Sequence, residues 1–413
     1  MRRSGARSSM KVLVIHHNET LGGAERSICE LAAGLVRKGV EVEALVPGEG
    51  GFKELLERAG AGVSVVEMPR LKRTLNPMKL ASYLKARKEL SEEARRRVKE
   101  GGFDIVHFNS LSAAVLFGEG LKELAPVVLH LRDSLVPRVV FSAYAKNFPA
   151  YVAISSYMER VLKEFLKVPP NRVFKVVNGI TFPERVTPER RKAAREALGI
   201  PQDAFVVLAA AAFVPWKNQH SLMDAFKKAR ERMNSPLLVL CGSDLTGENA
   251  THAKKIRSMA RSLKQSCLLA GQVDELEPWL HAADVFAHPA IGEPFGRAPA
   301  EAQAAGLPVV AYRSGAMEEV VEHGETGLIC ELDSAAFAEA LAALHDDVEM
   351  RRRMGEAAAE RARRLFDAER TADEVLELYR GLKSGKLPEP EPRPTVTQKE
   401  LRDMRRRKRR RTR

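Results

Sequence analysis

Short runs of consecutive apolar residues recur along the whole chain, with helical segments between them. The first run, Lys11–Ile15, is followed by a loop that contains Gly22 and Gly23, then by a segment with helical spacing of apolar residues, and then by a second apolar run at 40–46. Continuous apolar runs are typical of strands that are covered on both faces, as in parallel sheets. The order of strand, glycine loop, helix and strand therefore predicts a doubly wound α/β domain.

The same pattern appears twice, and the length of 413 residues suits two domains. In the first half we expect further strands at 103–109, 127–130, 151–155 and 173–180; in the second half the apolar runs lie at 205–208, 237–243, 267–273, 284–289 and 309–312. We therefore predict an N-terminal domain over residues 10–183 and a C-terminal domain over 184–365, joined by a crossing segment at 181–200.

One loop in the second half carries two carboxylates eight residues apart, Glu293 and Glu301. Pro299 suits the first turn of a helix, and Gly306 is a typical helix end. We expect Glu293 on the loop and Glu301 in the first helical turn, with backbone N–H groups aimed at an anion between them. Hydroxyl groups could then lie on either side, which suits a sugar joined to a ribose through a diphosphate.

The run from Ala282 to Ala311 that contains these glutamates resembles the E-x7-E motif of retaining GT-B glycosyltransferases, especially glycosyltransferase family 4. The resemblance extends over roughly residues 10–380. It implies an α/β fold of the GT-B type, in which two Rossmann-like domains face a central cleft and a last helix, at about 366–382, packs back on the first domain. It also implies transfer of a sugar, with retention, from a nucleotide-diphosphate sugar to a glycan, a lipid-linked or a small-molecule acceptor.

The resemblance implies roles for individual residues. Glu293 would hold a sugar hydroxyl, His130 would contact the sugar near the reacting carbon, and Lys217 would grip the diphosphate. The other residues that the resemblance assigns to donor binding are Glu301, Gly22, Gly23, Phe295, Gly296 and Gly242. Two further histidines end predicted strands: for His288 we expect a structural role, and for His107 a structural and a functional role both stay open.

One position departs from the family pattern. Relatives usually carry an arginine five residues before the lysine, and Ala212 stands there in this chain. We hypothesise that Arg297 supplies the missing positive charge. The alternative is a pseudoenzyme that binds a sugar nucleotide without transferring the sugar; a GT-B epimerase or phosphorylase is a further alternative.

The chain contains no Asp-x-Asp sequence, which in the other main transferase fold holds a metal ion on the diphosphate. Cations and backbone N–H groups would do that work here. We therefore predict metal-independent activity and no cofactor beyond the nucleotide-sugar substrate.

The net charge of +13 is unevenly distributed. Residues 405–413 carry eight positive charges, which leaves 13 − 8 = +5 for the rest of the chain. We expect residues 1–9 to be disordered and 383–413 to form a Pro- and Glu-rich linker with a disordered polybasic tail. Residues 71–100 have a helical pattern with ten basic residues, which indicates either a solvated face or a surface for an anionic membrane. For the tail we favour anionic lipid over nucleic acid.

Composition also bears on the compartment. The four cysteines are far apart and form no Cys-x-x-Cys motif, which fits a reducing environment. No apolar run approaches the roughly 20 residues of a membrane span, and the N-terminus lacks the apolar segment of a signal peptide. We expect a cytoplasmic protein that can associate with the inner face of a membrane.

Overall fold

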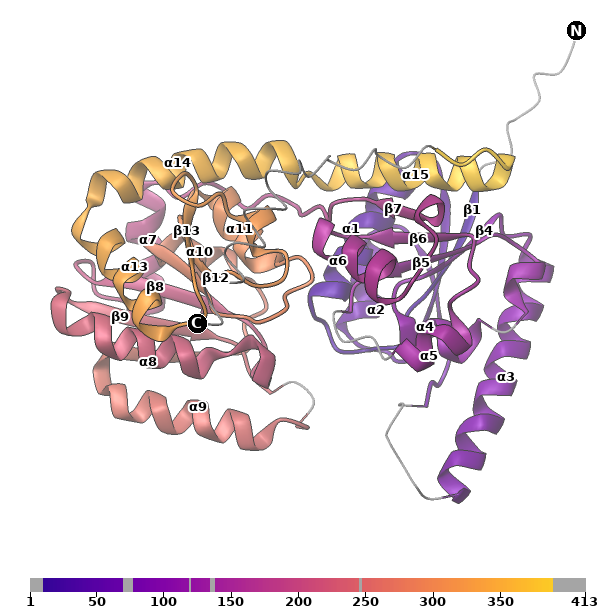
Figure 1. The fold of residues 1–413 in the computed structure, drawn as a ribbon, viewed down its shortest axis with the longest axis horizontal. Coiled ribbons are helices and arrows are strands. Elements are labelled where there is room, and N and C mark those ends of the chain that lie inside the picture. The colour runs from indigo at the N-terminus through magenta and orange to yellow at the C-terminus, as the bar shows by residue number, and fades with distance from the viewer. Residues whose placement is uncertain (1–9, 70–76, 119, 134–137, 245–246, 389–413) are drawn as a thin grey trace, which may run out of the picture.

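The structure is a computed structural model that describes residues 10–69, 77–118, 120–133, 138–244 and 247–388. The predictions for the N-terminus at 1–9, for the start of the basic segment at 71–76 and for the polybasic tail at 405–413 lie outside the described residues. Figure 1 shows two lobes, each built around one sheet, with the two longest C-terminal helices running along the same side of both lobes.

The first lobe contains a parallel sheet of seven strands in the order β3-β2-β1-β4-β5-β6-β7. Its strands are β1 (Lys11–Ile15), β2 (Glu41–Val46), β3 (Gly62–Val65), β4 (Ile105–Phe108), β5 (Val127–Leu131), β6 (Ala150–Ala153) and β7 (Val173–Lys175). The second lobe contains six parallel strands in the order β10-β9-β8-β11-β12-β13. These are β8 (Phe205–Ala210), β9 (Pro236–Cys241), β10 (Cys267–Gly271), β11 (Val285–His288), β12 (Val309–Tyr312) and β13 (Gly327–Cys330).

Helices cover both faces of each sheet, which explains why the central strands β4, β5, β6, β11 and β12 are buried along their whole length. The first lobe has α1 (Gly23–Arg37), α2 (Gly51–Arg58), α3 (Pro77–Gly101), α4 (Leu111–Phe117), α5 (Arg138–Tyr144) and α6 (Ser156–Arg160). The second has α7 (Pro188–Leu198), α8 (Gln219–Ala229), α9 (Ala250–Leu263), α10 (Glu277–Ala282), α11 (Arg297–Ala305), α12 (Met317–Val320), α13 (Ser334–Asp346) and α14 (Val348–Leu365). The predicted α/β class with two Rossmann-like sheets is confirmed.

Each sheet has one place where the strand order reverses. In the first sheet β1 pairs with both β2 and β4, and in the second β8 pairs with both β9 and β11. The chain continues from β1 towards β2 and from β4 towards β5, on opposite sides, and likewise from β8 towards β9 and from β11 towards β12. A crevice therefore opens beyond the carboxyl ends of β1 and β4 and of β8 and β11, where α/β proteins bind ligands. The loops after β1, β8 and β11 therefore start at the two crevices.

The last described helix, α15 (Ala368–Ser384), belongs to the second half of the chain but packs against α1 of the first lobe (Figure 1). Its buried residues Ala372, Val375 and Tyr379 share one apolar core with strand β1 and helix α1. The helix begins and ends two residues later than the approximate bounds of 366–382 expected from the resemblance. Asp367 caps the helix by accepting the N–H of Glu369, and Gly385 ends it with a φ of 71°.

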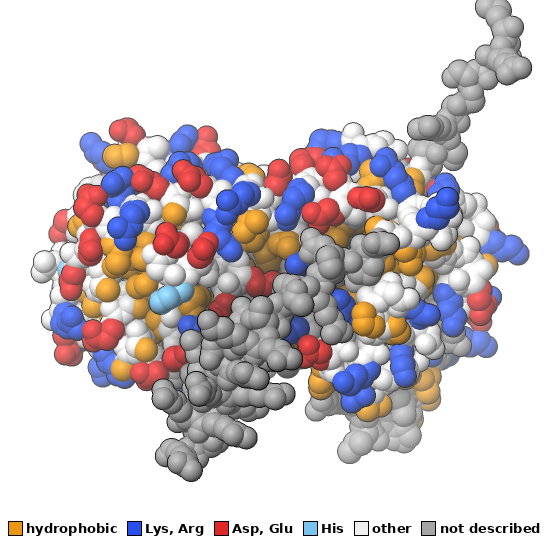
Figure 2. All heavy atoms as spheres, turned by 45° about the horizontal axis from the view of Figure 1, so that its top comes forward, with side chains coloured by type: hydrophobic (Ala, Val, Ile, Leu, Met, Phe, Trp, Pro, Cys, Tyr) orange, Lys and Arg blue, Asp and Glu red, His pale blue; other side chains and the backbone are white. Residues whose placement is uncertain are grey.

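Helix α3 carries the basic segment, and its cations have acidic neighbours one turn away. Arg96 donates to Glu93 at 2.9 Å and to Glu100 at 2.6 Å, and Arg97 donates to Glu93 at 2.6 Å. Both signs of charge are also interspersed on the face shown in Figure 2. The pairs favour the interpretation of α3 as a solvated helix. In the part of the chain that the structure describes, no helix is both long and apolar enough to span a membrane.

Candidate active site

The two lobes enclose a cleft with a volume of about 810 Å³. Of the ten predicted site residues, the structure brings nine to its walls: Gly22, Gly23, Lys217, Gly242, Glu293, Phe295, Gly296, Arg297 and Glu301. The cleft lies where the two crevices meet, because its lining includes the loop after β1 and the residues that follow β8 and β11.

The centre of the second-lobe wall is a buried carboxylate with two nitrogen donors. Glu293 lies on the loop after β11, and its Oε2 accepts from Lys217 Nζ at 2.5 Å and from His288 Nε2 at 2.9 Å. Lys217 ends the short turn after β8, with its ammonium 4.2 Å from the centre of the Trp216 ring. Three residues that are far apart in the sequence thus form one charged cluster in the cleft.

The charge of this cluster is set by competing effects on Glu293. Burial alone would raise the pKa of the Glu293 carboxyl, but the positive charge of Lys217 and the hydrogen bond from His288 outweigh it and lower the pKa to about 2. Burial lowers the pKa of His288, and the neighbouring Glu293 only partly opposes this effect. At neutral pH the cluster therefore holds one carboxylate, one ammonium and one neutral imidazole that donates through Nε2.

Acid should remove the stability that this ionised carboxylate contributes. The pKa of Glu293 falls from 4.5 to about 2 on folding, so its contribution is complete above about pH 4.5 and is lost as the pH falls towards 2. We expect thermal melts of the wild type and of Glu293→Gln to differ above pH 4.5 and to converge at lower pH. Glu349→Gln, which changes an exposed acid, should show no such convergence; a difference that persists to pH 2.5 would contradict the prediction.

Glu301 and Arg297 lie together on α11, but not as predicted. The helix begins at Arg297, after Gly296 with a φ of 102°, so Glu301 lies in the second turn and not in the first. Arg297 donates to Glu301 at 2.8 Å and, across the cleft, to Glu30 at 2.5 Å. Burial alone would lower the pKa of Arg297, but the two carboxylates raise it above its usual value. Arg297 therefore already has two negative partners in this arrangement of the lobes.

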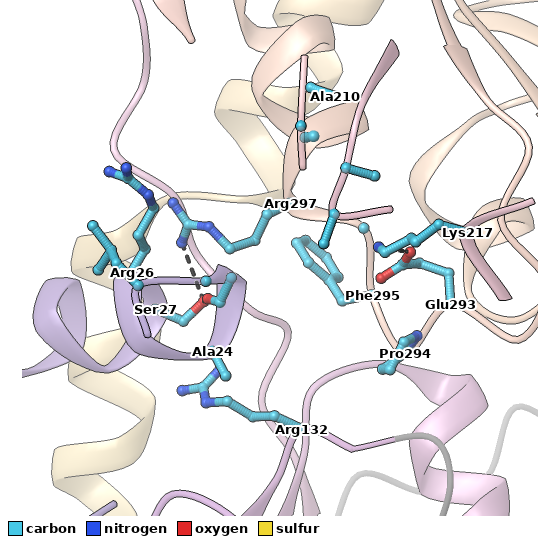
Figure 3. Close-up of a pocket in the computed structure, with 18 of the residues that line it drawn as sticks. Ala24, Arg26, Ser27, Arg132, Ala210, Lys217, Glu293, Pro294, Phe295 and Arg297 are labelled. Carbon is cyan, nitrogen blue, oxygen red and sulfur yellow. Dashed lines mark hydrogen bonds and ion pairs between the residues drawn. The ribbon is translucent and has the colours of Figure 1, made fainter. Parts of the chain in front are cut away.

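Further contacts fix the Glu293 loop against the first lobe. Ser155 donates its hydroxyl to the carbonyl oxygen of Pro294 at 2.6 Å, directly beside Glu293. The Glu319 carboxylate accepts the backbone N–H groups of Ser156 and Tyr157 at 2.6 and 2.8 Å. Arg297 also donates to Ser27 of α1 at 3.1 Å (Figure 3). The relative position of the lobes thus determines where the Glu293 loop lies.

His130 is the predicted site residue that the structure does not bring to the cleft wall. Its ring is buried 5.3 Å from the ring of His107, whose Nδ1 is 2.5 Å from the hydroxyl of Tyr379 on α15. The wall position is taken by Arg132, two residues further along the chain. Sequence reasoning missed Arg132 and the hydrogen bond of His288, although both residues lie at the carboxyl ends of predicted strands, where ligand contacts gather.

The described residues contain no group of three or more His, Cys, Asp and Glu side chains arranged to hold a metal ion. The four cysteines are unpaired, and burial raises the pKa of each thiol.

Comparison with known proteins gives matches over both lobes. Residues 21–182 match the model of Glycosyltransferase Family 4, and residues 190–361 match the model of Glycosyl transferases group 1. The chain belongs to glycosyltransferase family 4. The predicted family is confirmed, and this family 4 glycosyltransferase has the GT-B fold, with the predicted E-x7-E pair on one wall of its cleft.

Curated relatives span nearly the whole chain of this glycosyltransferase. The D-inositol 3-phosphate glycosyltransferase of Pseudarthrobacter chlorophenolicus is 29% identical over 87% of this chain and 90% of its own length. That of Paenarthrobacter aurescens is 27% identical over 89% of this chain and 94% of its own.

Solved structures show the same fold. Anabaena HepE in complex with UDP-glucose has a TM-score of 0.77 and 24% identity, over 90% of this chain and 100% of that chain. The sucrose-phosphate synthase of Thermosynechococcus elongatus has a TM-score of 0.75 and 21% identity, over 91% of this chain and 100% of that chain.

Proposed function

We propose that this glycosyltransferase moves a sugar from a nucleotide-diphosphate sugar to an acceptor hydroxyl with retention at the anomeric carbon. The observation that carries the proposal is the buried Glu293 carboxylate, held ionised at the cleft wall by Lys217 and His288. Such a carboxylate can accept a hydrogen bond from a sugar hydroxyl and set the position of the ring. Support also comes from the relatives named for glycosyl transfer to an inositol phosphate and from the fold shared with HepE, which was solved with UDP-glucose.

The donor would lie along the second-lobe wall. The ribose hydroxyls would donate to Glu301, and the diphosphate would lie between Lys217 and the N–H groups at the start of α11. Lys217 would then exchange part of its contact with Glu293 for a phosphate oxygen. In the reaction the bond between the anomeric carbon and the phosphate oxygen breaks, the acceptor oxygen forms a bond to the same carbon from the same face, and the departing phosphate takes the acceptor proton. The preorganised donors on the phosphate are each worth roughly 3 kcal/mol in other enzymes.

The first test is nucleotide release from a panel of UDP-, GDP-, ADP- and dTDP-sugars. We expect slow hydrolysis of one donor, unchanged by EDTA because Lys217 and backbone N–H groups neutralise the leaving group. Lys217→Ala and Glu293→Ala should lose the release, whereas Glu349→Gln, which alters an exposed acid on α14, should keep it. Release that EDTA abolishes and manganese restores would contradict metal independence. Failure of every donor to be hydrolysed or to stabilise the protein would contradict the function itself.

A second candidate, a sugar-nucleotide-binding pseudoenzyme, rests on the charges of the cleft. Ala212 lines the cleft in place of the usual arginine, and Arg297 is already matched by Glu30 and Glu301. This would leave Lys217 as the main cation for the diphosphate. Thermal stabilisation by one donor, with neither hydrolysis nor transfer to any acceptor, would favour this candidate. Membrane contact through 71–100 and 405–413 stays a prediction.

A further inference from the structure

The first-lobe wall of the cleft carries a buried arginine without a carboxylate partner. Arg132 follows strand β5, lines the cleft and is only 7% exposed. Among the described residues, no carboxylate oxygen lies within the 4 Å of an ion pair to its guanidinium. Asp133 also lines the cleft, but it makes no ion pair with Arg132. A charge that is removed from water without a counter-charge is costly, so its presence calls for an explanation.

The groups that do hold Arg132 are neutral. Its Nε donates to the amide oxygen of Asn109 at 2.7 Å, one terminal nitrogen donates to that of Asn178 at 2.6 Å, and the other lies 3.4 Å from Nδ1 of His130. Burial is the main cause that lowers the pKa of His130 well below its usual value, so this imidazole is uncharged at neutral pH. The positive charge of Arg132 is therefore positioned but not neutralised.

The two amides are themselves held in place. The nitrogen of Asn178 donates to the hydroxyl of Ser27 at 2.9 Å, and that of Asn109 donates to the carbonyl oxygen of Ala24 at 3.3 Å. Because each amide nitrogen has its own acceptor, each amide oxygen faces Arg132. The guanidinium has five N–H donors, and these contacts leave some of them for a ligand. These three neutral groups thus fix the orientation of the Arg132 guanidinium, and its remaining N–H donors can bind a ligand.

Two other cations of the cleft, unlike Arg132, have carboxylate partners. Lys217 pairs with Glu293, and Arg297 pairs with Glu30 and Glu301. Burial is the main cause that lowers the pKa of Arg132 to about 9, and at neutral pH it remains protonated. An incoming anion could therefore pair with Arg132 without first displacing a carboxylate that contacts it.

We propose that Arg132 binds an anionic group, a phosphate or a carboxylate, of the acceptor. The assignment to the acceptor follows from position: Arg132 rises from the first-lobe wall, whereas Lys217 and Glu293, which would hold the donor, lie on the opposite side (Figure 3). The proposal rests on the proposed function, because it names the chemistry of the second substrate in the same cleft. It makes Arg132 a specificity residue that distinguishes anionic from neutral acceptors.

The test is a calorimetric titration of the full chain with glucose 6-phosphate, inorganic phosphate and glucose, each without and with saturating UDP. With UDP present, we expect the wild type to bind both anions and to bind glucose at least about 10-fold more weakly. Arg132→Gln should weaken the two anions by about 10- to 100-fold and leave the affinity for UDP unchanged. Arg26→Gln is the matched control, since it removes another cation from the cleft wall and should change the affinity for the anions less than about threefold.

The possible outcomes separate the two proposals. If UDP does not bind the wild type, GDP, ADP or dTDP takes its place in the titrations, and failure of all four to bind would contradict the proposed function. The titrations without nucleotide would still show whether Arg132 holds an anion. Equal anion binding by the wild type and Arg132→Gln, no anion binding by the wild type, or a loss of UDP affinity in Arg132→Gln would each overturn the proposal. If Arg132 serves binding, the melting temperature of ligand-free Arg132→Gln should equal or exceed that of the wild type, because the substitution removes a costly buried charge. A large loss of stability would instead indicate a structural role.

Discussion

Replacing Lys217 by methionine should reduce sugar transfer by roughly 10²- to 10³-fold, the cost of losing one preorganised donor at a leaving group. It should also lower the free energy of unfolding by about 3–5 kcal/mol, because Glu293 would remain as a buried carboxylate without its cation. The first effect appears in the rate at saturating donor, and the second in denaturant unfolding at pH 7.

The double variant Lys217→Met/Glu293→Gln separates these two effects. Removing both charges leaves no isolated charge in the wall, so the stability should recover to within about 1–2 kcal/mol of the wild type, while transfer stays lost. His288 can still donate its Nε2–H to the amide oxygen that replaces the carboxylate. Additive losses of stability in the double variant would show that the two side chains do not form the charge pair described here.

Replacing Gly315 by alanine should lower stability by about 2–5 kcal/mol and reduce activity with it. Gly315 has a φ of 62°, and a Cβ there would overlap the backbone of Glu293. The neighbouring backbone also holds this loop, since Ala316 donates to the carbonyl oxygen of Glu293 at 2.9 Å. The loop would have to shift, which would disturb the contact between the Glu293 carboxylate and Lys217.

Gly324→Ala is the matched control for this change. Gly324 also has a positive φ, of 86°, but a Cβ there meets no atom within 4 Å. It should therefore show only the conformational cost of about 1–2 kcal/mol and keep its activity per folded molecule. Equal loss of activity in the two variants would mean that contact with the Glu293 backbone is not the cause.

Much of this architecture could be predicted because parallel strands and their loops leave local patterns. The apolar run at Lys11–Ile15 predicted a strand, and the glycines after it predicted a turn. The position of Glu293 on a cleft loop was predicted from a motif whose residues are neighbours in the chain. Pro299 lies in the first turn of α11, as predicted, but the helix begins two residues before it, at Arg297 after Gly296 with its φ of 102°, so Glu301 falls in the second turn.

The partners of these residues could not be predicted, because their contacts join distant parts of the chain. Lys217 and Glu293 are 76 residues apart, and Arg297 and Glu30 are 267 residues apart. No local spacing indicates such pairs. The first depends on how β8 and β11 lie side by side in the second sheet, and the second on how the two lobes face each other. Arg132 had a usable signal, a cation just beyond a buried strand, but only the structure reveals that its neighbours are neutral amides and an imidazole.

Helix α15 has a consequence for how the protein is made. During translation the first lobe leaves the ribosome long before the residues that complete its core, since Ala372, Val375 and Tyr379 pack beside β1 and α1. Until then the apolar surface of the first lobe that α15 covers stays exposed, which is the situation in which nascent chains bind chaperones or aggregate. A ribosome that stalls in the second lobe would thus release a first lobe that is incomplete, although all seven of its strands have been synthesised.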